Sequence, residues 1–152
     1  MKLAEALILR SDLQKRIEQL KVRLNRNVKV QEGDTPAEDP IEILKELDQL
    51  LTELESIIRK INYTNSLTSF SDEMRLSDAL TKRDILGMRR EILSEAANYA
   101  SIRQDRYSKS EVKFFATINV SQIQKEIDKL SKEYRELDTK IQELNWKTDV
   151  PE

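Results

Sequence analysis

Clustered carboxylates come nearest to a catalytic or metal-binding set in this 152-residue chain. The chain has no histidine and no cysteine, which removes Ser-His and Cys-His nucleophile pairs, thiol redox chemistry and the commonest zinc sites. Helical nucleotide hydrolases hold Mg²⁺ with clustered Glu and Asp. The candidates here are Glu42 with Glu46, and Glu133 with Glu136 and Asp138.

In both clusters the heptad pattern assigns the inward positions to Leu, Ile or Tyr, so the carboxylates fall on helix flanks. We therefore predict solvated helix faces, no enzymatic activity, and neither a metal nor another cofactor. A metal-dependent nucleotide hydrolase is a weaker alternative.

The strongest candidate for a binding surface is the polar stretch RQDRYSKSEVKFF, residues 103–115. Arginine beside tyrosine suits recognition of an anionic group, and both residue types often anchor interfaces. The stretch is either a polar corner that satisfies helix-end carbonyls or a contact surface for a protein partner, subunit or ligand. The interface candidates are Arg103, Asp105, Arg106, Tyr107, Lys109 and Glu111.

Two successive segments near the start carry opposite charge. Residues 10–29 hold seven bases and two acids, whereas residues 31–58 hold nine acids and one base. We expect these segments to lie side by side and neutralise each other; a basic patch for an external partner is the alternative. The net charge of −2 gives no case for binding nucleic acid.

The composition is typical of a helix-rich, coiled-coil-like protein. Charged residues make up 36% and aromatic residues 5%, with 2 Gly and 3 Pro, so we expect a single helical domain over residues 1–152. The first apolar run meets Arg10 and Asp12 too soon for a signal peptide. No stretch approaches the roughly 20 apolar residues that span a bilayer. We therefore expect a cytoplasmic protein that does not bind membranes.

Apolar periodicity predicts four helices, at about residues 2–27, 40–62, 78–103 and 120–146. Asp39 is placed to cap the second helix, with Pro40 at its first position and Glu42 closing a capping box. The core-facing positions predicted for the first three helices are as follows: Leu3, Ala6, Leu13, Ile17, Leu20 and Leu24; Leu44, Leu51 and Ile58 with Leu47, Leu54 and Ile61; and Leu80, Met88, Ile92, Ala96 and Ala100. Gly87 either permits close approach of another helix or is simply tolerated.

Two short segments alternate apolar and polar residues, at about 28–31 and 112–118. We predict that they pair as a small antiparallel β element, because a lone strand leaves backbone groups unsatisfied. Residues 62–77 are too polar for a tight connection, and their role is not predicted.

The last helix has the most regular pattern, with heptad columns of Ile123, Leu130, Leu137 and Leu144, and of Val120, Ile127, Tyr134 and Ile141. Such columns favour coiled-coil packing. The third helix has a patchy stripe and is a poor match. We therefore predict a homo-oligomer in which Leu130 and Leu137 meet a second subunit.

Several stretches of the chain, MKLAEALILRSDLQKRIEQL, KVQEG, PAEDP, RQDRYSKSEVKF and KEYRELDTKIQELNW, resemble the septicolysin-like family of small bacterial proteins over nearly its whole length. The resemblance implies a cytolysin but assigns no catalytic or ligand residue. The fold we expect is mainly α, a long-helix bundle with a small β element. The function we expect is that of a self-assembling structural or interaction protein, with a membrane-active cytolysin as the alternative.

Overall fold

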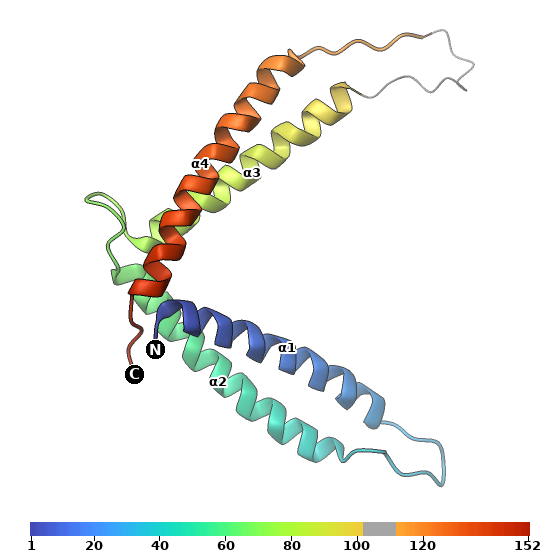
Figure 1. The fold of residues 1–152 in the computed structure, drawn as a ribbon. Coiled ribbons are helices and arrows are strands. Elements are labelled where there is room, and N and C mark those ends of the chain that lie inside the picture. The colour runs from blue at the N-terminus through green and yellow to red at the C-terminus, as the bar shows by residue number, and fades with distance from the viewer. Residues whose placement is uncertain (102–111) are drawn as a thin grey trace. The chain divides into compact units, whose positions relative to one another are not determined.

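The computed structural model describes residues 1–101 and 112–152 of the chain. The helices in these residues are α1 (Leu3–Asn27), α2 (Pro40–Leu67), α3 (Leu76–Ala100) and α4 (Val120–Lys147) (Figure 1). The prediction of a mainly α, bundle-like protein is confirmed. The second predicted helix was too short, because α2 continues past Asn62 to Leu67.

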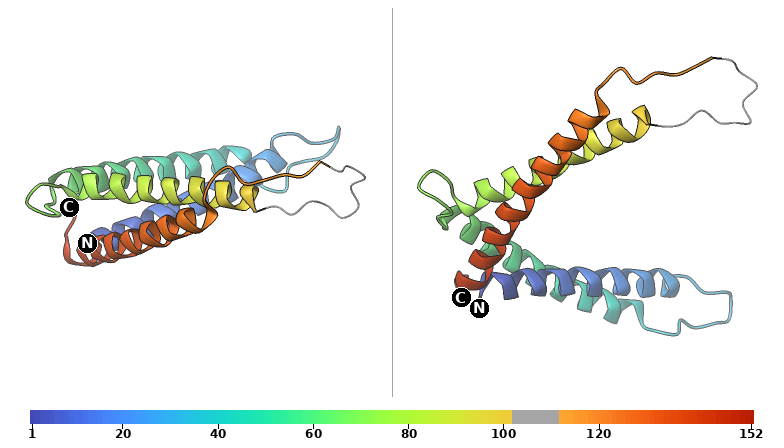
Figure 2. Two further views of the ribbon diagram at one scale, coloured as in Figure 1. Left: turned by 90° about the horizontal axis from the view of Figure 1, so that it is seen from above. Right: turned by 45° about the horizontal axis from the view of Figure 1, so that its top comes forward.

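The chain divides into two compact units. Unit 1 comprises Met1–Ser69 with Glu143–Glu152, and unit 2 comprises Phe70–Gln142. In unit 1, α1 and α2 form an antiparallel hairpin, and in unit 2, α3 and most of α4 form another (Figures 1 and 2). The expectation that residues 1–152 fold as one domain stays a prediction.

The seam between α1 and α2 is apolar. Its buried residues are Leu3, Ala6, Leu13 and Leu20 of α1, and Ile43, Leu47, Leu50, Ile57 and Ile61 of α2. The predicted column through Leu44 and Leu51 was wrong, because these side chains are 47% and 50% exposed. The buried column is shifted by one residue, to Ile43, Leu50 and Ile57. Both columns are apolar at heptad spacing, so the spacing did not distinguish them.

Residues 39 and 40 begin α2 as expected. The Asp39 carboxylate accepts a hydrogen bond of 2.9 Å from the Ile41 amide, and Pro40 occupies the first turn, where no intrahelical donor is needed. Glu42 does not close a capping box. It lies 3.2 Å from Lys45 instead, an exposed pair on the helix surface.

The two ends of the chain pair with each other inside unit 1. The Leu3 amide donates to the Thr148 carbonyl at 2.8 Å, and the Val150 amide donates to the Met1 carbonyl at 3.0 Å. Lys2 adds an ion pair of 3.1 Å with Asp149. These contacts attach the residues after α4 to the start of α1, and no sequence pattern indicated them.

The predicted β element was wrong. Neither residues 28–31 nor residues 112–118 form a strand. Val28 is 61% exposed and Phe114 is 80% exposed. Residues 28–39 close as a loop instead, because the Glu38 amide donates to the Asn27 side-chain oxygen at 2.9 Å. Within the 62–77 stretch, the amides of Phe70 and Ser71 donate to the Met74 carbonyl at 2.9 and 3.1 Å, which makes a tight turn before α3.

Candidate interaction surface

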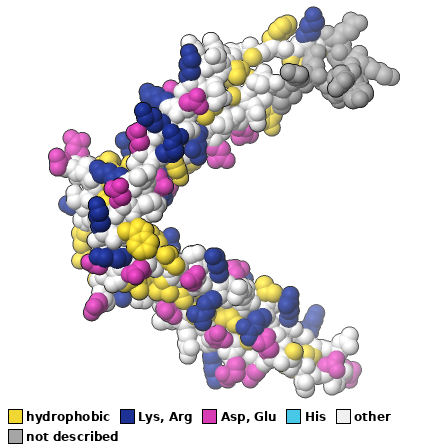
Figure 3. Space-filling view, viewed as in Figure 1, with side chains coloured by type: hydrophobic (Ala, Val, Ile, Leu, Met, Phe, Trp, Pro, Cys, Tyr) yellow, Lys and Arg dark blue, Asp and Glu magenta, His cyan; other side chains and the backbone are white. Residues whose placement is uncertain are grey.

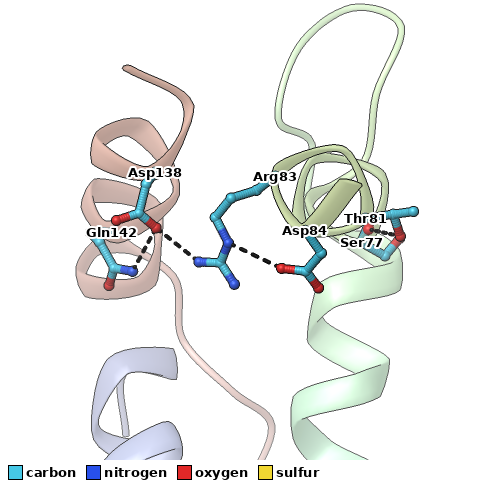
Figure 4. Close-up of polar contacts among 6 residues, drawn as sticks. All are labelled: Ser77, Thr81, Arg83, Asp84, Asp138 and Gln142. Atoms are coloured by element: carbon cyan, nitrogen blue, oxygen red, sulfur yellow. Dashed lines mark hydrogen bonds and ion pairs between the residues drawn. The ribbon is translucent and has the colours of Figure 1, made fainter. Parts of the chain in front are cut away.

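The seam of unit 2 is built around a charged pair. Arg83 of α3 donates to Asp138 of α4 at 2.8 Å, and Asp138 also accepts a hydrogen bond of 3.3 Å from Gln142 (Figure 4). The Arg83 and Asp138 side chains are only 22% and 34% exposed. Partial burial opposes the charge on Arg83, but the hydrogen bond and charge of Asp138 outweigh it and raise the pKa of the guanidinium. Arg83 therefore stays charged, and its bond to Asp138 fixes α3 against α4.

Gly87 lies on the same face of α3, one turn beyond Arg83. A Cβ added to Gly87 would lie 3.4 Å from Cε2 of Tyr134 on α4. The guanidinium of Arg90 lies over the same tyrosine ring, 4.9 Å from its centroid. An added methyl would thus make only an ordinary van der Waals contact, so of the two interpretations of Gly87 the structure favours the one in which the glycine is simply tolerated.

Leu130 and Leu137 of α4 lie on the seam side of the hairpin. Leu130 is only 6% exposed. Leu137 is half-buried and lines a shallow groove of about 370 Å³ with Leu86 of α3. Both residues are thus covered inside the chain to a large degree. The prediction that they meet a second subunit is not favoured by these contacts.

The acidic clusters show no metal-binding geometry. Asp138 is bonded to Arg83, and Glu42 pairs with Lys45. In the described part of the chain, no group of three or more Asp, Glu, His or Cys side chains is arranged to hold a metal ion. The predicted lack of enzymatic activity stays a prediction.

The stretch of residues 103–111 lies outside the described residues. This applies to all six interface candidates there: Arg103, Asp105, Arg106, Tyr107, Lys109 and Glu111.

The loop end of unit 1 is closed by polar contacts. Arg23 of α1 contacts Glu38 with two nitrogens, of which Nε lies 3.1 Å from the carboxylate. The hydrogen bond from Arg23 lowers the pKa of Glu38, and the same bond raises the pKa of Arg23. Asn27, only 7% exposed, accepts from the Glu38 amide and donates to the Arg23 carbonyl at 2.8 Å. Opposite charges of the two segments thus meet, as the sequence predicted.

The outer surface of α3 carries an exposed apolar stripe that we call the α3 stripe. Its members, with their exposed fractions, are Ile85 (42%), Met88 (56%), Ile92 (63%) and Tyr99 (71%). The sequence assigned Met88 and Ile92 to the core, which was wrong. The buried residues of α3 are Leu76, Ala79, Leu86 and Ala97. The buried positions of α3 are thus a different set from the positions of the stripe.

The segment that leads into α4 is also exposed and apolar. Phe114 and Phe115 are 80% and 81% exposed, and Ile118 is 39% exposed. Figure 3 shows, on the face it draws, acidic and basic side chains intermixed along both hairpins. Phe114 and Phe115 have the largest exposed fractions of the large apolar side chains in the described residues.

The described residues define an all-α protein of two helical hairpins, the second of which exposes an apolar stripe. The chain belongs to a family of unknown function, DUF6847, whose sequence profile matches residues 10–150. It is also similar to a solved protein from Corynebacterium diphtheriae, described as a functionally unknown conserved protein, at 49% identity and a TM-score of 0.93 over 99% of each chain. No curated protein matches the chain.

The resemblance to the septicolysin-like family was wrong, since the family profile and the solved relative both point elsewhere. The first and last of the stretches that carried the resemblance are rich in Leu, Glu and Lys, as amphipathic helices generally are. None of the described helices is long and apolar enough to cross a membrane. The cytolysin alternative is therefore not favoured.

Proposed function

We propose that this protein is a structural or interaction protein that works by self-association, without catalytic turnover. The observation that carries the proposal is the α3 stripe, whose four apolar side chains are between 42% and 71% exposed. Contiguous exposed apolar surface of this kind is typical of a protein interface.

The energetics favour covering the stripe. Complete burial of one large aliphatic side chain contributes roughly 1.5–3 kcal/mol, and these side chains are already partly covered, so each contributes less. Four of them together still provide a useful driving force for association. The inner face of α3 is already occupied by α4 through Arg83, Gly87 and Arg90, so only the outer face is free to supply it.

The mass of the protein in solution tests the proposal. A single chain has a mass of 17.8 kDa. We expect sedimentation velocity and light scattering to show a larger species at micromolar concentration that dissociates on dilution. A single 17.8 kDa species at every concentration up to the solubility limit would overturn self-association.

A further inference from the structure

We infer that the partner of the α3 stripe is the α3 stripe of a second copy, packed in parallel about a two-fold axis that runs along the helices. This inference rests on the proposed self-association. It adds which surface of the protein forms the interface and in which orientation the two α3 helices pack. It is carried by two observations: the spacing of the stripe and the charges on its two edges.

The spacing of the stripe is that of a coiled-coil seam. Ile85, Ile92 and Tyr99 recur every seven residues, and Met88 follows Ile85 by three. These are a and d positions of a heptad, the positions that meet in a helix pair; the next d position, three residues after Ile92, is the charged Glu95. The stripe extends about 21 Å along the axis, at 1.5 Å for each of 14 residues.

The two edges of the stripe carry opposite charges. On a helical wheel, Asp84 and Glu91 fall on one edge, whereas Lys82 and Arg89 fall on the other. All four are exposed. The surface is therefore apolar along its centre, acidic along one edge and basic along the other.

This asymmetry selects the orientation. In a parallel pair, the acidic edge of one helix faces the basic edge of its partner, and Asp84 stands five residues before Arg89, the spacing of an interhelical g-to-e′ pair. The two-fold axis makes this pair twice, from Asp84 of each copy to Arg89 of the other. In an antiparallel pair, each edge faces its own copy, so that acidic residues meet acidic residues and basic residues meet basic ones.

The α2 column that is also exposed lacks this feature. Leu44 and Leu51 are 47% and 50% exposed, but Asp48 and Glu55 lie beside them with no base at the corresponding positions. A second copy of α2 would therefore bring like charges together. A two-fold interface pairs one surface with its own copy, so that surface must complement itself. The α3 stripe does so in both its apolar pattern and its charges.

Disulfide trapping tests the orientation, because the chain has no cysteine of its own. We would introduce single cysteines as Ile85→Cys and Tyr99→Cys, with Lys132→Cys on the exposed surface of α4 as the control. In a parallel pair each residue meets its own copy, so both variants should cross-link under mild oxidation and the control should not. Two results would show an antiparallel pair and overturn the orientation. One is a cross-link in only one of the two variants. The other is a cross-link that forms only when the Ile85→Cys and Tyr99→Cys proteins are mixed.

Matched polar variants test the surface separately. Met88→Gln with Ile92→Gln should return the protein to the monomer mass with helix content unchanged by circular dichroism. Leu44→Gln with Leu51→Gln, a pair of similar exposure, should leave the assembly intact. If the α3 variant still assembles, the α3 stripe is not the interface although self-association stands. If the unmodified protein is itself a monomer, both the function and this inference fail.

The charge edges allow a rescue experiment. Arg89→Glu alone places an acid opposite the Asp84 of the second copy and should weaken association most at low salt. Adding Asp84→Arg restores an opposite-charge pair with its two charges exchanged, so this double variant should recover assembly. If it assembles no better than Arg89→Glu, the edges do not pair as inferred.

Discussion

The two hairpins have matching lengths but are held together in different ways. Each joins a helix of 25 residues to one of 28. Unit 1 buries Leu, Ile and Ala side chains from its two helices. Unit 2 also buries apolar residues, but across its seam Arg83 bonds to Asp138, and Arg90 lies over the Tyr134 ring. Apolar burial thus holds unit 1, and unit 2 adds directed polar contacts between its helices.

The two seams therefore differ in how strictly they fix the geometry of their helices. Apolar contact is non-directional, so α1 and α2 are held by burial, and polar contacts at the loop end close the hairpin. The bond between Arg83 and Asp138 requires a particular geometry, as does the approach of Tyr134 to Gly87.

The largest effect should come from the apolar seam of unit 1. Leu13 is only 1% exposed, and Leu13→Ala should lower the free energy of unfolding by about 2–5 kcal/mol, because it removes buried surface and leaves a cavity. Urea denaturation followed by the fluorescence of the single tryptophan, Trp146 of unit 1, measures the loss.

Ile8 on the same helix is the control, since it is 54% exposed. Ile8→Ala should change stability by less than about 0.5 kcal/mol. Equal losses in the two variants would contradict an apolar seam that is specific to the inner face of α1.

A smaller loss should follow from breaking the polar seam of unit 2. Asp138→Ala leaves the part-buried Arg83 without its strongest partner and should cost about 1–2 kcal/mol, a value reduced here for partial exposure. Urea denaturation followed by far-UV circular dichroism provides the measurement. Because a paired charge is often replaceable by apolar residues, Arg83→Met with Asp138→Leu should cost less than Asp138→Ala alone.

Asp84 supplies the matched control for this pair. It lies 3.5 Å from the same guanidinium, but its side chain is 67% exposed. Asp84→Ala should therefore change stability little. If it costs as much as Asp138→Ala, the two helices are not held by the contact across the seam.

Sequence pattern predicted the helices well because helix-forming signals are local. Asp39 and Pro40 marked the start of α2, and the heptads of α4 marked its whole length. The faces were harder to predict. In α2 two apolar columns competed, and in α3 Met88 and Ile92 looked like core although Leu86 and Ala97 are buried instead. Apolar residues lie on more than one face of these helices, so spacing alone did not identify the buried face.

The polar contacts that shape unit 2 were not predictable from spacing alone. Arg83 and Asp138 are 55 residues apart, and each looks like one more charged residue on a helix flank. The tie between Leu3 and Thr148 is a backbone contact with no side-chain signature. The residues 112–118 alternate like a strand but lack a partner strand in the structure described, so their local pattern was misleading.

The smallest effect tests how closely the second seam is fitted. Gly87→Ala should raise stability by up to about 1 kcal/mol, because alanine favours the helix over glycine. The added methyl would touch Tyr134 at 3.4 Å, an ordinary van der Waals contact. Gly87→Val should instead lower stability, because its further methyl groups reach beyond that contact into the ring. Thermal melts of both variants measure the two changes. A gain with valine would mean that the Tyr134 ring moves aside easily, and that α3 and α4 are set by Arg83 and Asp138 alone.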